Sequence, residues 1–222
     1  GEYSAVLRME NPVQKYSADI DSYYEFTSLL TAIAQTLGEG YAIHKQDVFV
    51  RKRFEDGTNE RHEFLSAAYF RYFNGRRYTD STCYLTVTQE ARKSGLFSFD
   101  GKKWRDFLVK IRKVHDLLHD AGIQAEFLGK SQAKEFVDRY FAMNFRDRIV
   151  SMTNFKVDDE TVSMGGKRCK VYSLVDVDCV SLPSLVRPYT NIEVNNTEMP
   201  VDLLSVIDSI PEAETVVYNQ VI

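Results

Sequence analysis

The sequence predicts an α+β fold, in which a ferredoxin-like (split βαβ) sheet of mixed or antiparallel strands, with one inserted helix, is followed by a smaller β-rich extension. Three observations support this. Residues 38–55 alternate with a period of two around aromatic and β-branched residues, as in a strand. Apolar residues recur every three or four positions in residues 22–37 and 102–121, as in helices that cover a sheet. Without the helix expected at 61–73, the elements from residue 2 to residue 128 run β-α-β-β-α-β, and one further helix follows them.

Residues 1–145 form the predicted ferredoxin-like core. Its strands are expected at residues 2–9, 38–55, 82–88 and 123–128, and its helices at residues 22–37, 61–73, 102–121 and after a cap at Ser131. Ser22 and Glu25 predict a capping box for the first helix. A fully parallel, doubly wound sheet is the alternative, but it needs longer apolar strands than residues 38–55 provide.

Two helices of this core carry aromatic side chains whose placement the periodicity predicts. Phe64, Ala68 and Tyr72 share one face of the helix at 61–73. In the helix after Ser131, the residues expected to face inward are Phe136, Tyr140 and Phe141. Exposed aromatic residues are candidates for an interface, and those proposed here are Tyr23, Tyr24 and Tyr69.

From residue 146 to residue 222 the sequence predicts a β-rich extension with one short helix. Strands are expected at 149–157, 161–164, 169–176 and 215–222, with a hairpin turn at Gly165-Gly166. Met199-Pro200 is expected to open the helix, which runs to about Ile210. The extension is either a second subdomain or a continuation of the same sheet. Because both ends of the chain carry strand-like apolar patterns, we expect it to belong to a longer protein.

Composition narrows the class of protein. The 222 residues are 44% hydrophobic and 27% charged, which is ordinary for a globular domain, and the net charge of −4 gives no reason to expect tight binding to nucleic acid. Cys83, Cys169 and Cys179 include no Cys-x-x-Cys pair, which argues against a disulfide framework and a zinc knuckle. No apolar run approaches the roughly 18 residues that span a bilayer.

The string Gly129-Lys130-Ser131 follows an expected strand and opens an expected helix, as a phosphate-binding loop does. That loop needs a glycine five residues before its second glycine, so that four residues can curl around the phosphates. Gln124 occupies that position here. We therefore expect Gly129 to be a turn and Ser131 a helix cap.

The histidines do not form a complete site in the sequence. His115 and His119 have the spacing that clamps a metal, but no third ligand is evident, so a core histidine and a surface histidine are expected. His44 and Asp47 are three apart on a strand and face opposite sides of it. We therefore expect no catalytic residue, no metal ligand and no cofactor.

Charged residues in and near residues 38–55 form the candidate interaction patch. Lys45 and Asp47 interrupt one face of this strand, so at least one of its ends is expected to reach past the core into solvent or a partner. The basic residues predict either a solvated face balanced by acidic neighbours or a patch for a partner or nucleic acid. The candidate patch consists of Arg51, Arg53, Arg76, Arg77, His44 and Asp47.

Residues 41–50, 71–88 and 191–210 resemble the N-terminal region of the TraG-type conjugation ATPases carried by Bacteroides conjugative transposons. These are relatives of the VirB-type ATPases that energise type IV secretion. The resemblance extends over essentially the whole chain, and its most distinctive pieces are residues 44–47, after a Tyr-x-Ile, and residues 73–85. In this family the nucleotide-binding motor follows the N-terminal domain. No phosphate loop occurs in this sequence, so the resemblance implies truncation before the motor and transfers no ATPase residue.

The resemblance implies a non-catalytic module that docks the motor to channel or inner-membrane components during conjugative DNA transfer. Its implied location is cytoplasmic and peripheral to the inner membrane. The expected partners are its own C-terminal ATPase domain and other conjugation-channel proteins; a homo-oligomer stays open, and nucleic acid is not expected. Two alternatives remain. One is an enzyme whose site combines dispersed residues such as His44, Asp47, His62 and Cys83, and the other is a DNA-contacting module that uses the four arginines.

Overall fold

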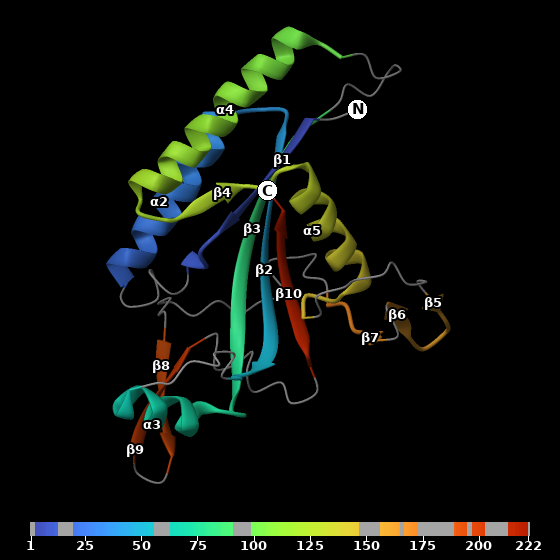
Figure 1. Cartoon of the computed structure of the whole chain (residues 1–222). Coiled ribbons are helices and arrows are strands. Elements are labelled where there is room, and N and C mark those ends of the chain that lie inside the picture. Colours follow the sequence, from blue (N-terminus) through green and yellow to red (C-terminus); the bar gives the residue numbers. More distant parts are fainter. Residues whose placement is uncertain are drawn as a thin grey trace.

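The structure, a computed structural model, describes residues 3–12, 20–55, 63–90, 99–146, 156–164, 167–172, 189–194, 197–202 and 213–221 of the chain (Figure 1). Its helices are α2 (Ile20–Leu37), α3 (Phe64–Phe73), α4 (Gly101–Asp120) and α5 (Lys130–Ala142). Its strands are β1 (Tyr3–Met9), β2 (Tyr41–Arg53), β3 (Arg77–Gln89), β4 (Ala125–Phe127), β5 (Lys156–Val157), β6 (Val162–Met164), β7 (Lys167–Cys169), β8 (Tyr189–Val194), β9 (Thr197–Asp202) and β10 (Thr215–Val221). Of these four helices, none has the length and apolar content that a membrane crossing requires.

The main sheet has the ferredoxin-like topology. Its five antiparallel strands lie in the order β10-β2-β3-β1-β4, and α2 and α4 each connect two strands that flank a third, as in a split βαβ unit. This confirms the predicted fold class, and the parallel doubly wound alternative is wrong. The helix inserted between the paired strands β2 and β3 is α3. From the far end of the chain, β10 pairs with β2 over Thr215↔Val50 to Val221↔His44 and so becomes an edge strand of the same sheet.

Strands β2 and β3 form a ribbon that is longer than the rest of the sheet. They pair over 13 residues each, from Tyr41↔Gln89 to Arg53↔Arg77, whereas β1 reaches only Cys83 of β3. The sequence predicts β3 at residues 82–88 only, because residues 77–81 lack an apolar alternation. They join the strand since β2 offers them a continuous backbone ladder. The far end of the ribbon extends past α2 and α4 and carries α3 (Figure 1).

The hydrophobic core lies between the sheet and the helices α2 and α4. The predicted apolar stripe of α4 is confirmed, since it buries Phe107, Ile111, Val114 and Leu118 against Leu7, Leu85 and Val87 of the sheet. Phe107 is fully buried, and its ring centroid lies 5.8–6.3 Å from those of Tyr3, Tyr41 and Trp104. The Asp100 carboxylate caps α4 by accepting hydrogen bonds from the backbone N–H groups of Lys103 and Lys102, and these bonds hold its pKa below the usual value.

One lysine of α4 provides a hydrogen-bond donor for the C-terminal end of α2. The Lys110 ammonium group donates to the Leu37 carbonyl, which is one of the carbonyls that a helix end leaves without an intrahelical partner. Its nitrogen also lies 4.4 Å from the centroid of the Tyr41 ring, within cation–π distance. Gly38 follows with φ +70°, as a left-handed helix terminus requires. This lysine therefore links α4, α2 and the start of β2.

Helix α5 packs on the opposite face of the sheet. The ring of its buried Phe136 lies 4.3 Å, centroid to centroid, from that of Tyr84, which alternates in β3 with the core residues Cys83 and Leu85. Phe141 is 57% exposed, so its predicted inward orientation is wrong. It lies five residues after Phe136, about 140° around the helix, and so faces away from the side that packs on the sheet.

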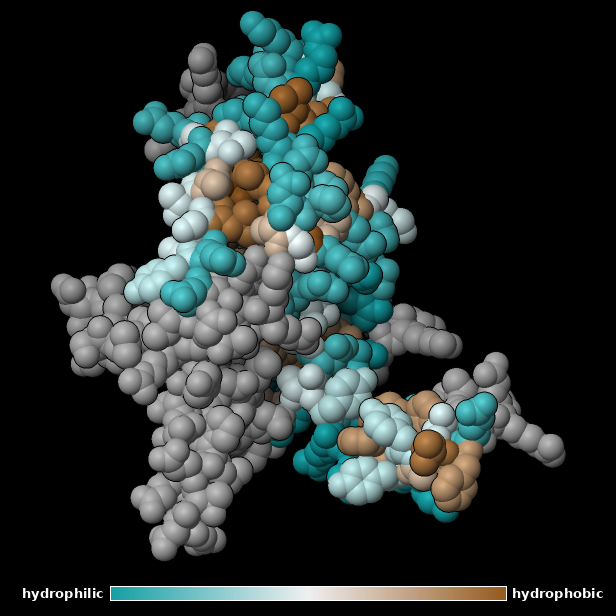
Figure 2. Space-filling view, turned by 90° about the vertical axis from the view of Figure 1, so that its left-hand side faces the viewer, coloured by the Kyte–Doolittle hydropathy of each residue, from teal (hydrophilic) through white to brown (hydrophobic). Residues whose placement is uncertain are grey.

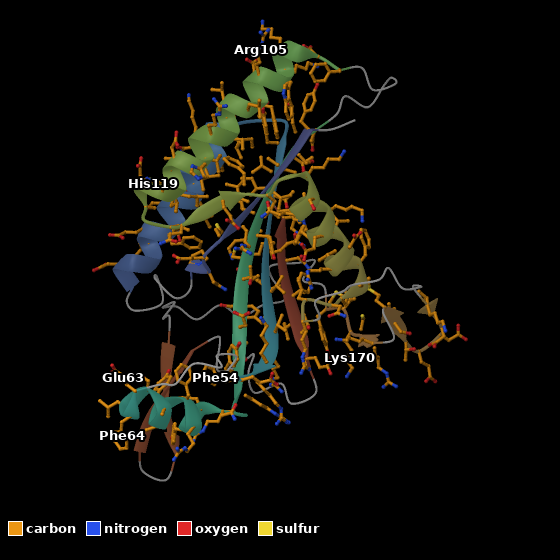
Figure 3. All side chains as sticks on the ribbon, viewed as in Figure 1. Phe54, Glu63, Phe64, Arg105, His119 and Lys170 are labelled. Atoms are coloured by element: carbon orange, nitrogen blue, oxygen red, sulfur yellow. The ribbon has the colours of Figure 1, made fainter. Side chains whose placement is uncertain are left out.

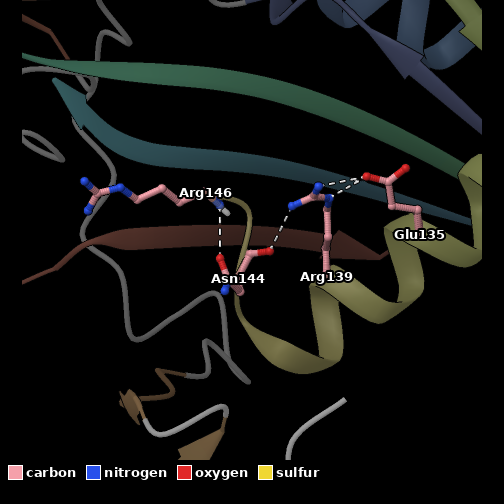
Figure 4. A network of polar contacts seen from close by, with 4 residues as sticks. All are labelled: Glu135, Arg139, Asn144 and Arg146. Carbon is pink, nitrogen blue, oxygen red and sulfur yellow. Dashed lines mark hydrogen bonds and ion pairs between the residues drawn. The ribbon is translucent and has the colours of Figure 1, made fainter. Parts of the chain in front are cut away.

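The C-terminal end of α5 is closed by a network of polar contacts (Figure 4). The Asn144 N–H donates to the Arg139 carbonyl and the Met143 N–H to the Tyr140 carbonyl, which is the Schellman arrangement. The Arg139 side chain bonds both the Asn144 carbonyl, at 3.4 Å, and the Glu135 carboxylate, at 2.8 Å. This geometry places Met143 at φ 47°, in the left-handed region that normally favours glycine.

Several predicted boundaries are wrong. α2 begins at Ile20, so Ser22 lies inside the helix and does not cap it. α5 is capped by Gly129 rather than by Ser131. Thr197–Asp202 is a strand, so the helix predicted to open at Met199-Pro200 does not start there, and residues 203–210 lie outside the described residues.

The hairpin predicted around Gly165-Gly166 is confirmed by the pairing of Met164 with Lys167 in the sheet β5-β6-β7. The strand predicted at 169–176 is wrong over residues 170–172, because β7 ends at Cys169; residues 149–155 and 173–176 lie outside the described residues. The predicted boundary between residues 145 and 146 stays a prediction. The pairing of β10 with β2 shows that the end of the chain returns to the sheet of the core.

Candidate interaction site

The six residues of the candidate patch do not share one surface, because the ribbon separates them onto its two faces. Asp47 lies directly across from Cys83, on the face that α2 and α4 cover. His44 is three residues before Asp47 and therefore faces the opposite side of the strand, as predicted, which is the side that α5 covers. Asp47 is only 4% exposed, so it does not contribute to a surface patch.

A buried ion pair occupies the centre of β2. Lys45 is 7% exposed and its ammonium group pairs with the Asp47 carboxylate. Burial and the neighbouring Asp47 carboxylate raise the pKa of the Cys83 thiol above its ordinary value, whereas Lys45 lowers it by less. A thiol held in the protonated form is a poor nucleophile. The structure thus brings Asp47 and Cys83 of the enzyme hypothesis together, in an arrangement that makes the cysteine inert.

His44 belongs to a small polar cluster on the other face. Its Nε2 lies 3.1 Å from Asn219 Oδ1, and the Gln46 side-chain amide donates to the same oxygen at 3.0 Å. These bonds join β2 to β10 and give His44 a structural partner. His62, the remaining residue of the enzyme hypothesis, lies outside the described residues.

The four arginines of the patch gather near the free end of the ribbon. Arg53 pairs directly across from Arg77, and Arg51 lies two residues before Arg53 on the same face. The Arg76 guanidinium is stacked over the Tyr72 ring, 3.5 Å from its centroid. We use the name tip arginines for Arg53, Arg76 and Arg77, all of which are exposed.

Helix α3 is anchored to this end of the ribbon by one aromatic face. Phe54 exchanges backbone hydrogen bonds with residues after the helix, from its N–H to the Arg76 carbonyl and from the Gly75 N–H to its own carbonyl. Its ring packs against Phe70 at 5.8 Å and Phe73 at 6.3 Å, measured between centroids. Gly75, with φ +77°, supplies the left-handed turn that ends α3 where the sequence predicts.

The opposite face of α3 is also apolar, and it is exposed. Phe64, Leu65, Ala68, Tyr69 and Tyr72, which we call the outer face, share an arc of about 140° on a helix of 3.6 residues per turn. Phe64 is 87% exposed, Leu65 80%, Tyr69 57% and Tyr72 59%, and α3 has no buried residue. A helix that is apolar all round is normally buried. α3 is therefore an apolar helix with one face uncovered.

Helix α3 lies apart from the hydrophobic core. In Figure 2 apolar and aromatic side chains gather over α3 in a lobe at the lower right, apart from the main body. Figure 3 places Glu63 and Phe64 at the end of α3 that is farther from the ribbon, with Phe54 on the ribbon side. Glu63 is the N-cap residue, and its side chain makes no capping hydrogen bond.

The string that resembles part of a phosphate loop is accounted for by a helix start. The Gly129 N–H donates to the Gln132 side-chain oxygen at 2.8 Å, so it is already bonded within the turn. The string is a helix start, but Gly129 is the extended N-cap residue of α5, with φ −67° and ψ 168°, so the assignments of Gly129 as a turn and of Ser131 as the cap are wrong.

His115 and His119 have different environments. His115 Nε2 lies 3.1 Å from the Ala125 carbonyl, and its ring stacks on Phe127 at 5.2 Å between centroids. The His119 side chain is 82% exposed. The partly buried histidine therefore has hydrogen-bond and stacking partners, as predicted. Among the residues that the structure describes, no group of three or more His, Cys, Asp or Glu side chains is placed to hold a metal ion.

Compared with protein-family models and with curated proteins, the chain matches none of either. The resemblance to TraG-type conjugation ATPases therefore stays a prediction.

The sequence predicts part of the outer face, but not that this face is exposed. It placed Phe64, Ala68 and Tyr72 on one face and proposed Tyr69 as an interface residue, and all four belong to the outer face. It did not predict that the aromatic residues Phe70 and Phe73 cover the ribbon side and so leave the outer face free. The available signal was that apolar residues occur all round the helix and not in a single stripe.

Proposed function

We propose that this chain is a non-catalytic docking module and that it binds a protein partner through the outer face of α3. The observation that carries the proposal is that α3 is apolar on both faces yet buries none of its residues. Contiguous exposed apolar surfaces rimmed by polar residues mark protein–protein interaction sites. The Arg76 guanidinium over Tyr72 and the exposed N-cap residue Glu63 supply polar groups at the two ends of this surface.

The resemblance supplies the setting for this proposal. In a conjugation ATPase of the TraG type, the module would dock the motor domain that follows it, or channel proteins, at the cytoplasmic side of the inner membrane. The inert thiol of Cys83 and the bonded N–H of Gly129 support a module without chemistry of its own. The rigid attachment of α3 through Phe54 supports a preformed docking surface, which lowers the entropic cost of binding.

The test is a calorimetric titration of the purified chain with the ATPase domain of its parent protein and then with magnesium-ATP. We expect the motor domain to bind, and magnesium-ATP to give no heat of binding. A double variant with Leu65→Glu and Tyr69→Glu is expected to lose binding, because it places charge on the apolar face. Arg105→Glu, an exposed reversal on α4 at the other end of the molecule, is the control and is expected to bind as wild type (Figure 3).

Two results would contradict the proposal. If the wild-type chain bound neither the motor domain nor any channel protein, it would not be a docking module. If magnesium-ATP bound with micromolar affinity, the chain would handle nucleotide itself, and the interpretation of Gly129-Lys130-Ser131 as a simple helix start would have to be given up.

Contact with DNA is the second candidate, and the gathering of the tip arginines beside Tyr72 favours it. Aromatic rings and arginines together can hold single strands. Binding of this kind weakens steeply as salt rises and depends on the charges. A double variant with Arg53→Glu and Arg77→Glu would then abolish binding of a single-stranded oligonucleotide, whereas Leu65→Glu would leave most of it.

A further inference from the structure

The outer face of α3 has the pattern of a surface that can pack against itself. Phe64, Ala68 and Tyr72 are spaced four residues apart and form a stripe of large, small and large side chains. Such a stripe is unchanged in outline when the helix is reversed about Ala68. An isologous contact needs this property, because the same patch must serve both copies.

Charge follows the same symmetry. The N-terminal end of α3 carries the exposed Glu63, and its C-terminal end carries the exposed Arg71 and Arg76. Two copies packed antiparallel would set the acidic end of each beside the basic end of the other, and the two helix dipoles would also be opposed. A parallel arrangement would bring like charges together.

The position of Arg76 makes this pairing specific. Its guanidinium lies over the Tyr72 ring, 3.5 Å from the ring centroid, so its charge is held beside the apolar stripe. With Ala68 on the two-fold axis, Tyr72 of one copy meets Phe64 of the other. Glu63 precedes Phe64, so this contact sets the acidic end of that second copy at the helix end that carries the Arg76 guanidinium of the first. The Glu63 side chain makes no capping bond that this contact would break.

The exposed area is sufficient for a reversible dimer. At their observed exposures, Phe64, Leu65, Tyr69 and Tyr72 present on the order of 500 Å², since a fully exposed side chain of this size offers about 150–250 Å². Two copies would bury about 1,000 Å² in total, which lies at the lower end of specific interfaces.

From the symmetry of the stripe, the opposed charges and the area, we infer that the occupant of the outer face is a second copy of this chain, packed with α3 antiparallel about a two-fold axis at Ala68. The inference rests on the proposed docking function and names its partner. It makes the module a dimerisation unit, which would set two copies of whatever follows it side by side.

The experiment is sedimentation equilibrium on the full chain at concentrations from about 5 to about 500 µM, which bracket the affinities of small interfaces. The mean mass of wild type is expected to rise from 25.6 kDa toward twice that value. Ala68→Glu is expected to keep the chain monomeric, because a carboxylate on the axis meets its own copy. Circular dichroism and thermal melting serve as folding controls, and all variants lie on exposed positions.

A charge-swap pair tests the geometry. Glu63→Arg alone and Arg76→Glu alone are each expected to weaken self-association at least tenfold, because both symmetry-related contacts become repulsive. An equimolar mixture of the two variants restores attraction at both contacts, so a heterodimer is expected to form. Arg105→Glu is the control and should self-associate as wild type does.

Each outcome decides a claim. A wild-type chain that stays at 25.6 kDa throughout overturns the inference, and so does a dimer that Ala68→Glu and both charge reversals leave intact. If the chain is monomeric but Leu65→Glu with Tyr69→Glu abolishes motor binding, the occupant is a different protein and the proposed function stands. If the monomer instead binds a single-stranded oligonucleotide through this face, both the inference and protein docking fail.

Discussion

The two ends of the β2–β3 ribbon carry similar aromatic residues that have opposite environments. At the end covered by α2 and α4, Phe107 is fully buried among other rings. At the free end, Phe64 on α3 is 87% exposed, although it also lies in an aromatic helix. The difference is that α4 has one apolar stripe and a partner for it, whereas α3 has two apolar faces and a partner for only one. The first end accounts for stability, and the second is available for binding.

The sharpest test of this comparison is to truncate one phenylalanine at each end. Phe107→Ala is expected to lower the free energy of unfolding by about 3–5 kcal/mol, because it leaves a cavity in a filled core. Phe64→Ala is expected to change it by no more than about 0.5 kcal/mol, since the side chain is exposed. Urea denaturation of both variants at protein concentrations below the range of self-association measures the contrast in the monomer. Similar losses there would mean that the outer face of α3 is covered within the single chain and is not free.

The buried ion pair of β2 gives a second large effect at the middle of the ribbon. Asp47→Ala is expected to cost about 3–5 kcal/mol, because it leaves the Lys45 ammonium group buried without its partner. The double variant Lys45→Met with Asp47→Leu is expected to be near neutral, since it removes both charges and keeps the volume. Denaturation of the two variants tests this, and a double variant as unstable as the single one would contradict it.

This ion pair also shows where the sequence is informative and where it is not. The alternation of residues 38–55 predicts β2, and the stripe of α4 predicts its buried face, because each pattern has one period and one covering partner. The same alternation cannot predict that Lys45 and Asp47 are buried, since each is typical of an exposed position. Their burial depends on neighbours from β3, which are distant in sequence, and on the pairing of the two charges with each other.

The candidate site was predictable in its residues but not in its arrangement. The arginines were identified as a cluster from their positions in the sequence, and the ribbon register that sets Arg53 across from Arg77 could not be read from them. Residues 77–81 are polar, so the sequence predicts that the strand begins at residue 82 and places Arg76 and Arg77 outside the sheet, although Arg51 and Arg53 belong to the strand predicted at 38–55. The sequence also does not predict the pairing of β10 with β2, because no local pattern indicates which edge of a sheet a strand from a distant part of the chain joins.

A smaller effect is expected where α2 ends against α4. Lys110→Met keeps the aliphatic stem but removes the charge that binds the Leu37 carbonyl and the Tyr41 ring. The helix-end and cation–π contributions together predict a loss of about 1 kcal/mol. Lys113→Met, on the exposed side of the same helix, is the matched control and should change stability by less than about 0.5 kcal/mol. Equal effects of the two variants in thermal melts would show that Lys110 makes no specific contribution.

The smallest expected effect has the opposite sign and concerns the end of α5. Met143 occupies φ 47°, where a side chain costs about 1 kcal/mol relative to glycine, so Met143→Gly relieves strain in the native state. Part of this gain is lost with the partly buried methionine side chain, and we expect a net stabilisation of about 0.5 kcal/mol. Ala142→Gly, one residue earlier in helical geometry, is expected to destabilise by about 1 kcal/mol. Opposite signs for adjacent positions in urea denaturation would locate the strain in the φ angle of Met143, because a general effect of glycine would have the same sign at both.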